Sequence, residues 1–227
     1  MGGFKPLLDI GGKPALLRLL DTIRAAGIED LVVVTGHERD AVESALAAYG
    51  DATQKNGSFE HNGDGSFYVS LRTQQEPFPC VSLCVSCVFN ETYESGMFSS
   101  VQTGVRRAAT MGEAGAALLF PADVPLVSVG TILGLLDVCE KDGPPRFAVP
   151  VFNGRNGHPL LIPSAFYKEI LAYKGEGGLK EIRNRHSAEM LRYEVDDEGC
   201  VLDMDTPEDY EYLLDYAEKA AGKMRDE

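Results

Sequence analysis

The chain has 227 residues, of which 44% are hydrophobic, and this length can bury the core of one α/β domain. Its formal net charge of −14 argues against DNA or RNA as a partner, because binding a polyanion requires clustered Lys and Arg. No apolar run approaches the roughly 18 residues that span a bilayer, and the first six residues lack the apolar centre of a signal peptide. We therefore expect a cytoplasmic protein without a membrane segment.

Helical and strand patterns alternate along the first two thirds of the chain. Apolar residues recur at helical spacing in some segments, whereas short runs of Val, Leu and Ala are typical of buried strands. Strands separated by helices predict parallel βαβ units. In chain order we predict a helix over 13–26, a strand over 31–35, a helix over 38–49, a strand over 81–89, a helix over 97–109, a strand over 116–120 and a helix over 129–139.

The order changes after the apolar run 147–151. There we predict a strand at 159–162, helices near 164–172 and 179–186, and a strand around 190–195. The last helix is well marked, because Thr206 can cap it, Pro207 can be its first residue and Asp209 can complete a capping box.

One polar stretch interrupts the early alternation. Residues 51–79 form a polar insertion with Asn-Gly turn signals, around which a hairpin at 66–72 is predicted. No internal repeat and no low-complexity linker divides the sequence. We therefore predict a single domain over residues 1–227.

Two acidic segments follow or precede predicted elements at places suited to a metal ion. Ligands of open α/β sheets bind at the carboxyl ends of strands, and the strand 117–120 runs into Pro121-Ala-Asp-Val-Pro125. The carboxylate of Asp123 suits Mg²⁺ there, with an ordinary turn aspartate as the alternative. Asp205 could be a second ligand, although it could also stabilise the amino end of the last helix.

Lysines and small residues lie at two further strand ends. Lys5 and Lys13 flank a turn that contains Gly11 and Gly12, and a plain surface lysine is the alternative for each. Gly96 permits close backbone approach, and Ser99 and Ser100 open a helix whose free N–H groups can receive polar ligand atoms. The competing interpretation of this second segment is a plain helix cap.

The five cysteines are an odd number scattered through apolar segments, which favours free thiols over disulfides. Cys80, Cys84 and Cys87 have the spacing C-x3-C-x2-C, which resembles the iron–sulfur ligands of radical S-adenosylmethionine enzymes. The alternation within 81–89 instead predicts a strand, on which Cys84 and Cys87 would point to opposite faces and could not share a cluster.

Together, these segments resemble the MobA-like nucleotidyltransferases that act on molybdenum cofactor, and especially their cytidylyltransferase branch. The resemblance implies an α/β, three-layer, Rossmann-like nucleotidyltransferase (GT-A-like) fold with a mostly parallel central sheet. The matching segments are Phe4-Lys-Pro-Leu-Leu8, Gly11-Gly-Lys-Pro14, Val33-Val-Thr-Gly-His37, Asn90 to Ser100, Pro121-Ala-Asp-Val-Pro-Leu126, Gly157-His-Pro159 and Asp203-Met-Asp-Thr-Pro-Glu-Asp209.

The resemblance also implies a reaction, in which a phosphate oxygen of an acceptor attacks the α-phosphorus of an NTP and pyrophosphate leaves. Asp123 and Asp205 would hold Mg²⁺, and Lys5 would contact the phosphates. The expected substrates are CTP and molybdopterin, and a molybdoenzyme is an expected partner. His158 is a candidate acceptor contact, with a structural histidine as the alternative, and the nucleotide would be bound by Lys5, Thr35, Gly36, Gly96, Ser99 and Ser100.

The sequence departs from the family at its start. Family members begin with a buried strand and a loop of the form L-A-A-G-x-S-x-R-M-G, and Met1-Gly2 falls where the last two residues of that loop would be. We expect a central strand position to be empty and the triphosphate to lack backbone donors, unless the natural start lies upstream, which the intact mass of natively expressed protein tests. The alternatives are a sugar-phosphate nucleotidyltransferase and a catalytically inactive cofactor-binding or insertion protein.

Overall fold

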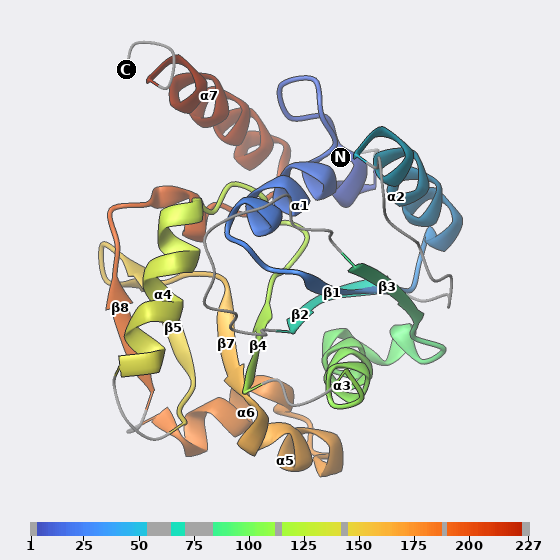
Figure 1. Ribbon diagram of the computed structural model, residues 1–227, viewed down its shortest axis with the longest axis vertical. Coiled ribbons are helices and arrows are strands. Elements are labelled where there is room, and N and C mark those ends of the chain that lie inside the picture. The colour runs from blue at the N-terminus through green and yellow to red at the C-terminus, as the bar shows by residue number, and fades with distance from the viewer. Residues whose placement is uncertain are drawn as a thin grey trace.

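The structure is a computed structural model that describes residues 4–53, 65–70, 84–111, 115–141, 145–187 and 190–223. These residues form an eight-stranded sheet of order β3-β1-β2-β4-β7-β5-β6, with β8 also paired to β5 (Figure 1). The strands are β1 (Asp30–Thr35), β2 (Gly65–Ser70), β3 (Cys84–Phe89), β4 (Ala116–Leu119), β5 (Ala148–Phe152), β6 (Arg155–Asn156), β7 (Leu160–Pro163) and β8 (Leu191–Glu194).

Most of the described strands run in one direction. β1 is parallel to β3, β5 is parallel to β8, and the antiparallel pairings through β2 and β7 give β4 and β5 the same direction as β1. The predicted α/β class and the prevailing parallel direction are confirmed. The neighbours in the middle of the sheet are nevertheless antiparallel, because β2 and β7 lie between strands of the common direction.

The central position that we expected to be empty is filled by β2. Val69 of this strand is paired with Leu31 of β1 on one side and with Leu118 of β4 on the other, both in antiparallel register. The predicted local hairpin at 66–72 is wrong for the part that the structure describes, since β2 pairs with two strands distant in the sequence. By pairing with β1 and β4, β2 provides the backbone hydrogen-bond partners that buried strands require on both edges. The rest of the predicted insertion beyond Thr53 lies outside the described residues.

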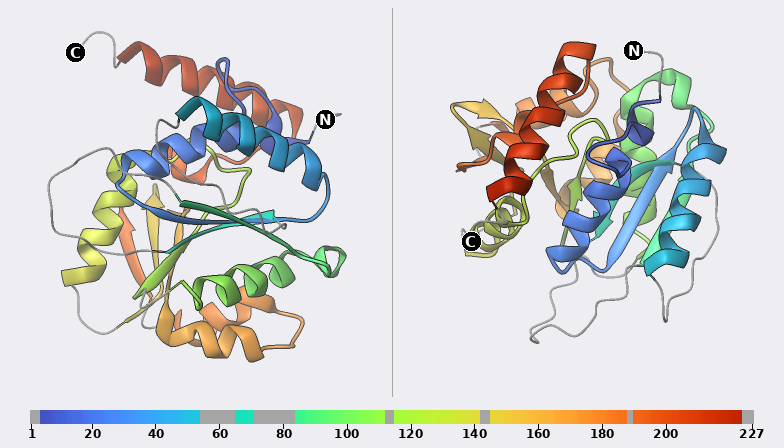
Figure 2. Two further views of the ribbon diagram at one scale, coloured as in Figure 1. Left: turned by 45° about the vertical axis from the view of Figure 1, so that its right-hand side comes forward. Right: turned by 90° about the horizontal axis from the view of Figure 1, so that it is seen from above.

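Helices cover both faces of the sheet, as the three-layer prediction requires (Figure 2, left). On one face lie α1 (Ala15–Ala25), α2 (Arg39–Thr53) and α4 (Val129–Lys141), and on the other lie α3 (Met97–Ala108), α5 (Tyr167–Ala172) and α6 (Gly178–Arg185). The last helix, α7 (Pro207–Lys223), packs against the turn that precedes α1. Short 3-10 helices complete the description, namely η1 (Lys5–Leu7), η2 (Tyr93–Ser95), η3 (Ser164–Phe166) and η5 (Glu198–Val201).

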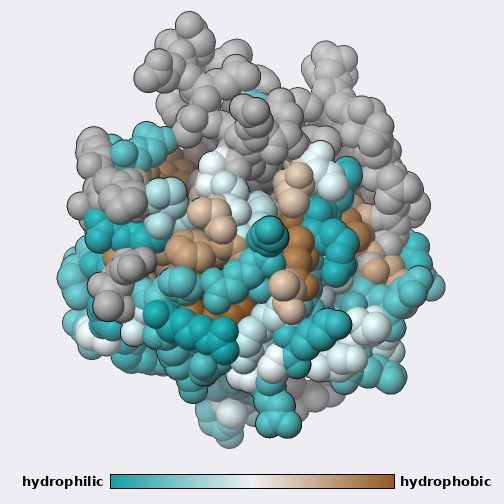
Figure 3. Space-filling model, turned by 90° about the horizontal axis from the view of Figure 1, so that it is seen from below, coloured by the Kyte–Doolittle hydropathy of each residue, from teal (hydrophilic) through white to brown (hydrophobic). Residues whose placement is uncertain are grey.

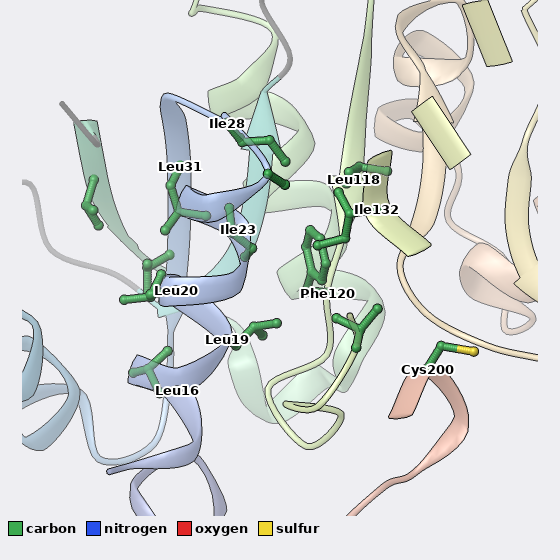
Figure 4. Packing of buried hydrophobic residues seen from close by; sticks show 14 of the residues in the cluster. Leu16, Leu19, Leu20, Ile23, Ile28, Leu31, Leu118, Phe120, Ile132 and Cys200 are labelled. Atoms are coloured by element: carbon green, nitrogen blue, oxygen red, sulfur yellow. The ribbon is translucent and has the colours of Figure 1, made fainter. Parts of the chain in front are cut away.

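The larger core cluster fills the space between α1 and the sheet. Leu16, Leu19, Leu20 and Ile23 form the apolar stripe of α1 and are fully buried, and they face Leu31 of β1 (Figure 4). Burial of such side chains stabilises the fold by about 1.5–3 kcal/mol each. A second cluster on the opposite face joins α3, α5 and α6 to the sheet. The outer surface on that side is mainly hydrophilic, with hydrophobic residues gathered near its middle (Figure 3).

Most helix boundaries follow the local signals. Gly27 ends α1 with a φ of +75°, the left-handed conformation that glycine adopts readily. The capping box of α7 is confirmed, because Asp209 N donates to Thr206 Oγ1 (3.1 Å) and Thr206 N donates to Asp209 Oδ2 (2.9 Å). The predicted end of the second helix at Tyr49 is wrong, since α2 continues through Gly50 to Thr53. One glycine costs a helix only about 1 kcal/mol, which its neighbours can offset.

Cys87, Cys139 and Cys200 are free cysteines, as predicted. Positions 84 and 87 both belong to β3, where residues three apart face opposite sides of the sheet. The strand interpretation of this segment is therefore confirmed for 84–89, and Cys80 lies outside the described residues. No helix in the described residues is both long enough and apolar enough to cross a bilayer.

Candidate active site

A pocket of about 980 Å³ opens at the carboxyl ends of β1 and β4. It is lined by six of the residues predicted to bind substrate, which come from five separate segments of the chain. Gly96, Ser99 and Asp205 are not part of the lining. The six residues in the wall are Lys5, Thr35, Gly36, Ser100, Asp123 and His158.

Lys5 and Asp205 form an ion pair that joins the two ends of the sequence. Lys5 Nζ donates to Asp205 Oδ1 at 2.7 Å, and the two side chains are 36% and 66% exposed. This hydrogen bond raises the pKa of Lys5, and the nearby carboxylates of Asp205, Asp123 and Asp203 act in the same direction. Lys5 is therefore fully protonated at neutral pH and lies beside three acidic groups.

Asp123 lies in the proline-flanked turn after β4, as predicted. Its pKa is raised, first by burial and then by the charges of Asp205 and Asp203, while a backbone hydrogen bond and Lys5 lower it. A carboxylate that burial and like charges destabilise gains most from an added cation. The pocket wall at Asp123 is thus electrostatically suited to bind a metal ion.

A divalent ion here would draw only some of its ligands from the protein. In the part of the chain that the structure describes, no three His, Cys, Asp or Glu side chains are grouped closely enough to hold a metal ion. Mg²⁺ commonly takes one or two carboxylates and completes its shell with substrate phosphates and water. Asp123 and Asp205, which approach the same lysine, fit that donor set.

The two acidic segments are fixed by Asp197, which the sequence analysis did not identify. This residue is 7% exposed, and its carboxylate accepts hydrogen bonds from Ser128 N (2.8 Å), Thr131 Oγ1 (2.6 Å) and Gly199 N (3.0 Å). A Cβ at Gly199 would lie 2.1 Å from the carbonyl oxygen of Leu126. Asp197 therefore joins the start of α4, just after the Asp123 turn, to η5, just before the Asp203–Asp205 segment.

The loop before α3 is organised by Asn90. This buried amide donates from Nδ2 to Ser99 Oγ (2.7 Å) and Ser100 Oγ (2.9 Å), and its Oδ1 accepts from Thr92 N (3.0 Å). Ser99 Oγ lies 2.8 Å from the carbonyl oxygen of Gly96, so its hydroxyl bonds within the loop. Gly96 has a φ of +99°, which explains the glycine at this sharp entry to the helix. Only Ser100 of these residues faces the pocket.

Thr35 and Gly36 form the pocket wall at the end of β1. A Cβ at Gly36 would lie 2.5 Å from the Cβ of Tyr93, so only glycine allows this contact between the β1 loop and η2. Thr35 Oγ1 is buried and has no hydrogen-bond partner among the described residues. A buried hydroxyl without a partner is costly unless a ligand or a water completes it.

His158 forms the wall near β7. Its backbone N donates to the carbonyl oxygen of Cys200 (2.8 Å), and a Cβ at Gly157 would lie 2.6 Å from the same oxygen, so this segment packs tightly on η5. Burial lowers the pKa of His158 to about 4, with a further contribution from Arg183. The imidazole is therefore neutral at pH 7, and its Nδ1 is buried without a partner in the described structure.

Three further basic residues have different roles, since one stabilises the fold and two line the pocket. Lys13 pairs with Asp21 and lies over the ring of Tyr49, 5.2 Å from its centroid, so its role is structural. Lys180 and Arg183 of α6 line the pocket although no sequence signal singled them out. The signal that could have identified them is their spacing of three residues, which places both side chains on one face of a helix.

Comparison with known proteins identifies the family of the chain. The model of the MobA-like NTP transferase domain matches residues 1–190. The purine catabolism protein PucB of Bacillus subtilis (strain 168) is 33% identical over 121 residues, which are 53% of this chain and 57% of PucB. The chain thus spans little more than half the length of this curated relative.

Solved structures share the fold at low sequence identity. Rv0371c of Mycobacterium tuberculosis H37Rv superposes with a TM-score of 0.64 at 22% identity, covering 95% of this chain and 91% of that chain. A manganese complex of the same protein gives a TM-score of 0.62, at 22% identity and over 94% of this chain and 93% of that one. The 4-diphosphocytidyl-2C-methyl-D-erythritol synthase of Anaerococcus prevotii gives 0.63 at 12% identity, over 94% of this chain and 93% of that chain. With a family model that matches most of its length, the chain belongs to the MobA-like NTP transferase domain family.

Proposed function

We propose that this protein transfers a nucleotidyl group from an NTP to a phosphorylated small molecule, in its specific form CMP from CTP to molybdopterin. The observation that carries the proposal is the meeting of Lys5 and Asp123 in one pocket at the strand ends. A phosphate oxygen of the acceptor would form a bond to the α-phosphorus, and the bond from that phosphorus to the bridging oxygen of pyrophosphate would break. The choice of CTP and molybdopterin rests on the sequence resemblance.

The divalent cation would be held by Asp123 and Asp205. When bound, Mg²⁺ would neutralise the charge that develops on the phosphate oxygens. A manganese complex of a relative with the same fold supports the use of a divalent cation. The exposure of Asp205 and the raised pKa of Asp123 both favour exchange of their present partners for a metal ion.

Lys5 would contact the triphosphate. Its ammonium is held by Asp205 at 2.7 Å, so a cation that binds Asp205 would leave Lys5 free to turn to a phosphate oxygen. A positive charge placed where negative charge develops stabilises the transition state, and in a site that excludes water such an effect is worth several kcal/mol. We therefore assign Lys5 and Asp123 the catalytic roles.

The nucleoside would lie against the β1 end and the start of α3. The unpartnered hydroxyl of Thr35 and the hydroxyl of Ser100 face this part of the pocket, and Gly36 allows the backbone to approach closely. Gly96 and Ser99 would act indirectly by fixing the loop. His158 would contact the acceptor through its buried, neutral imidazole.

Pyrophosphate release tests the proposal. The purified chain is incubated with Mg²⁺, each of the four NTPs in turn, and either molybdopterin or a sugar 1-phosphate. We expect release only with CTP and molybdopterin, and loss of release in Asp123→Ala without loss of far-UV circular dichroism. Release with a sugar 1-phosphate alone would instead assign a sugar-phosphate nucleotidyltransferase, and absence of binding to any NTP would refute transferase function.

A pair of neighbouring carboxylates gives a matched comparison. Asp203 and Asp205 have the same charge and are both exposed, but only Asp205 bonds to Lys5. If Asp205 is the second metal ligand, Asp205→Asn raises the Mg²⁺ concentration needed for half-maximal release far more than Asp203→Asn does. Equal effects of the two variants would show that general negative charge, rather than a ligand, is being removed.

A further inference from the structure

Two cations of α6 contribute to the wall of the pocket. Lys180 and Arg183 are one helical turn apart, and both contribute to the pocket wall. Neither side chain makes a hydrogen bond or an ion pair with any residue that the structure describes. Unpaired cations that line a cavity are well placed to receive an anionic ligand.

The next arginine of the same helix shows the contrast. Arg185 pairs with Glu181 at 3.4 Å and with Glu169 at 3.9 Å, and its guanidinium lies 5.1 Å from the centroid of the Tyr173 ring. In a chain with a net charge of −14, acidic partners are plentiful. Lys180 and Arg183 have no such partner among the described residues, which distinguishes these two cations from Arg185 on the same helix.

A third group in the same wall lacks a partner. His158 Nδ1 is buried without a hydrogen bond in the described structure, and the charge of Arg183 is one of the causes that lower the pKa of this imidazole. Arg183 and His158 are thus close enough to interact electrostatically. A buried polar atom near the guanidinium of Arg183, in a wall that also contains Lys180, is an arrangement that an anion with several acceptor oxygens would complete.

These three residues belong to other segments of the chain than the residues proposed to hold the metal ion and the triphosphate. Lys5 belongs to η1 and Asp123 follows β4, whereas His158 leads into β7, and the glycine that begins α6, Gly178, packs on Phe98 of α3. In the sheet, β4 and β7 are adjacent antiparallel strands. The pocket wall therefore contains basic groups from η1 and from α6, of which Lys5 already pairs with Asp205.

We propose that Lys180, Arg183 and His158 form a second anion subsite that binds the phosphomonoester of the acceptor. This inference rests on the proposed function and deepens it, because an in-line displacement needs the attacking phosphate opposite the departing pyrophosphate. The subsite holds the attacking dianion, while Lys5 and the metal ligands hold the leaving group. It also selects acceptors that carry a terminal phosphate over neutral alcohols.

The test uses inorganic phosphate and Mg-CTP as separate probes on the full chain. Phosphate binding is followed through the imidazole NMR signals of His158 and by calorimetry. Neutralising both cations in Lys180→Gln/Arg183→Gln should weaken phosphate binding by at least about tenfold, the equivalent of one lost charge-assisted hydrogen bond. The matched control, Arg185→Gln, removes a charge from the same helix and should change phosphate affinity by less than about twofold.

Measurements with Mg-CTP distinguish this subsite from other places in the protein where phosphate could bind. Mg-CTP affinity should fall in Lys5→Gln and stay close to wild type in the α6 double variant. The inference is overturned if wild-type protein binds no phosphate, if Lys5→Gln removes the His158 response, or if the folded double variant loses Mg-CTP binding together with phosphate binding. A wild-type chain that binds phosphate at His158 but never releases pyrophosphate would refute the proposed transferase and leave the anion subsite standing.

Discussion

Removing the carboxylate of Asp197 should destabilise the protein strongly, because this one buried side chain joins two segments of the site. In Asp197→Ala, the backbone N–H groups of Ser128 and Gly199 and the hydroxyl of Thr131 lose their acceptor. Hydrogen bonds to a charged group contribute about 1.5–3 kcal/mol each. Water can enter the space and satisfy part of the loss, so we expect a decrease of about 3–5 kcal/mol in the free energy of unfolding.

The measurement is urea unfolding monitored by far-UV circular dichroism, since the chain contains no tryptophan. Asp196→Ala is the matched control, because Asp196 is the exposed neighbour with the same charge, and it should change stability by no more than about 0.5 kcal/mol. The isosteric Asp197→Asn presents an amide N–H₂ to at least one of the three donors and should be destabilised as well. A loss below about 1 kcal/mol in Asp197→Ala would refute the idea that this residue holds the segments together.

Three further predictions concern two residues of the pocket wall and one residue of the loop before α3. Burial lowers the pKa of His158 to about 4, so between that value and about 6.5 the unfolded chain binds more protons than the folded one, and stability should fall by about 3 kcal/mol as the pH drops through this window. Urea unfolding of wild type and His158→Gln at several pH values checks this, and an equal pH slope in both would contradict it. Gly36→Ala should weaken Mg-CTP binding measured by calorimetry, because the added methyl group would meet Tyr93, whereas unchanged affinity would show that this contact yields easily. Asn90→Ala should lower the free energy of unfolding by about 2–3 kcal/mol through the lost bonds to Ser99 and Ser100, and a neutral result in thermal unfolding would rule out its role in the loop.

Local signals predicted the elements whose conformation depends on neighbours in the sequence. The capping box of Thr206 and Asp209 fixed the start of α7, and the apolar stripe of Leu16, Leu19 and Leu20 identified α1. Such features are set within one or two helical turns, so the sequence carries them directly.

Features that depend on distant partners were not predictable in the same way. Nothing local shows that β2 inserts between β1 and β4, because pairing across a sheet depends on which strands need partners. Asp197 belongs to an acidic run, and such runs are typical of the solvent-exposed surface. It is buried here because it bonds both to the start of α4 and to η5, which are distant in the sequence. The resemblance assigned Lys5 and Asp205, 200 residues apart, to one site, but nothing in the sequence predicted that they form an ion pair.

The central claim, that Asp123 is a ligand of a divalent cation in a nucleotide complex, is tested most directly by titrating the protein with Mn²⁺ in the presence of CTP. The free ion is counted by electron paramagnetic resonance. We predict that wild-type protein binds Mn²⁺ more tightly with CTP than without it, and that Asp123→Asn weakens the CTP-dependent binding by at least about tenfold while the fold is kept. Wild-type Mn²⁺ affinity in the folded Asp123→Asn variant would contradict the assignment.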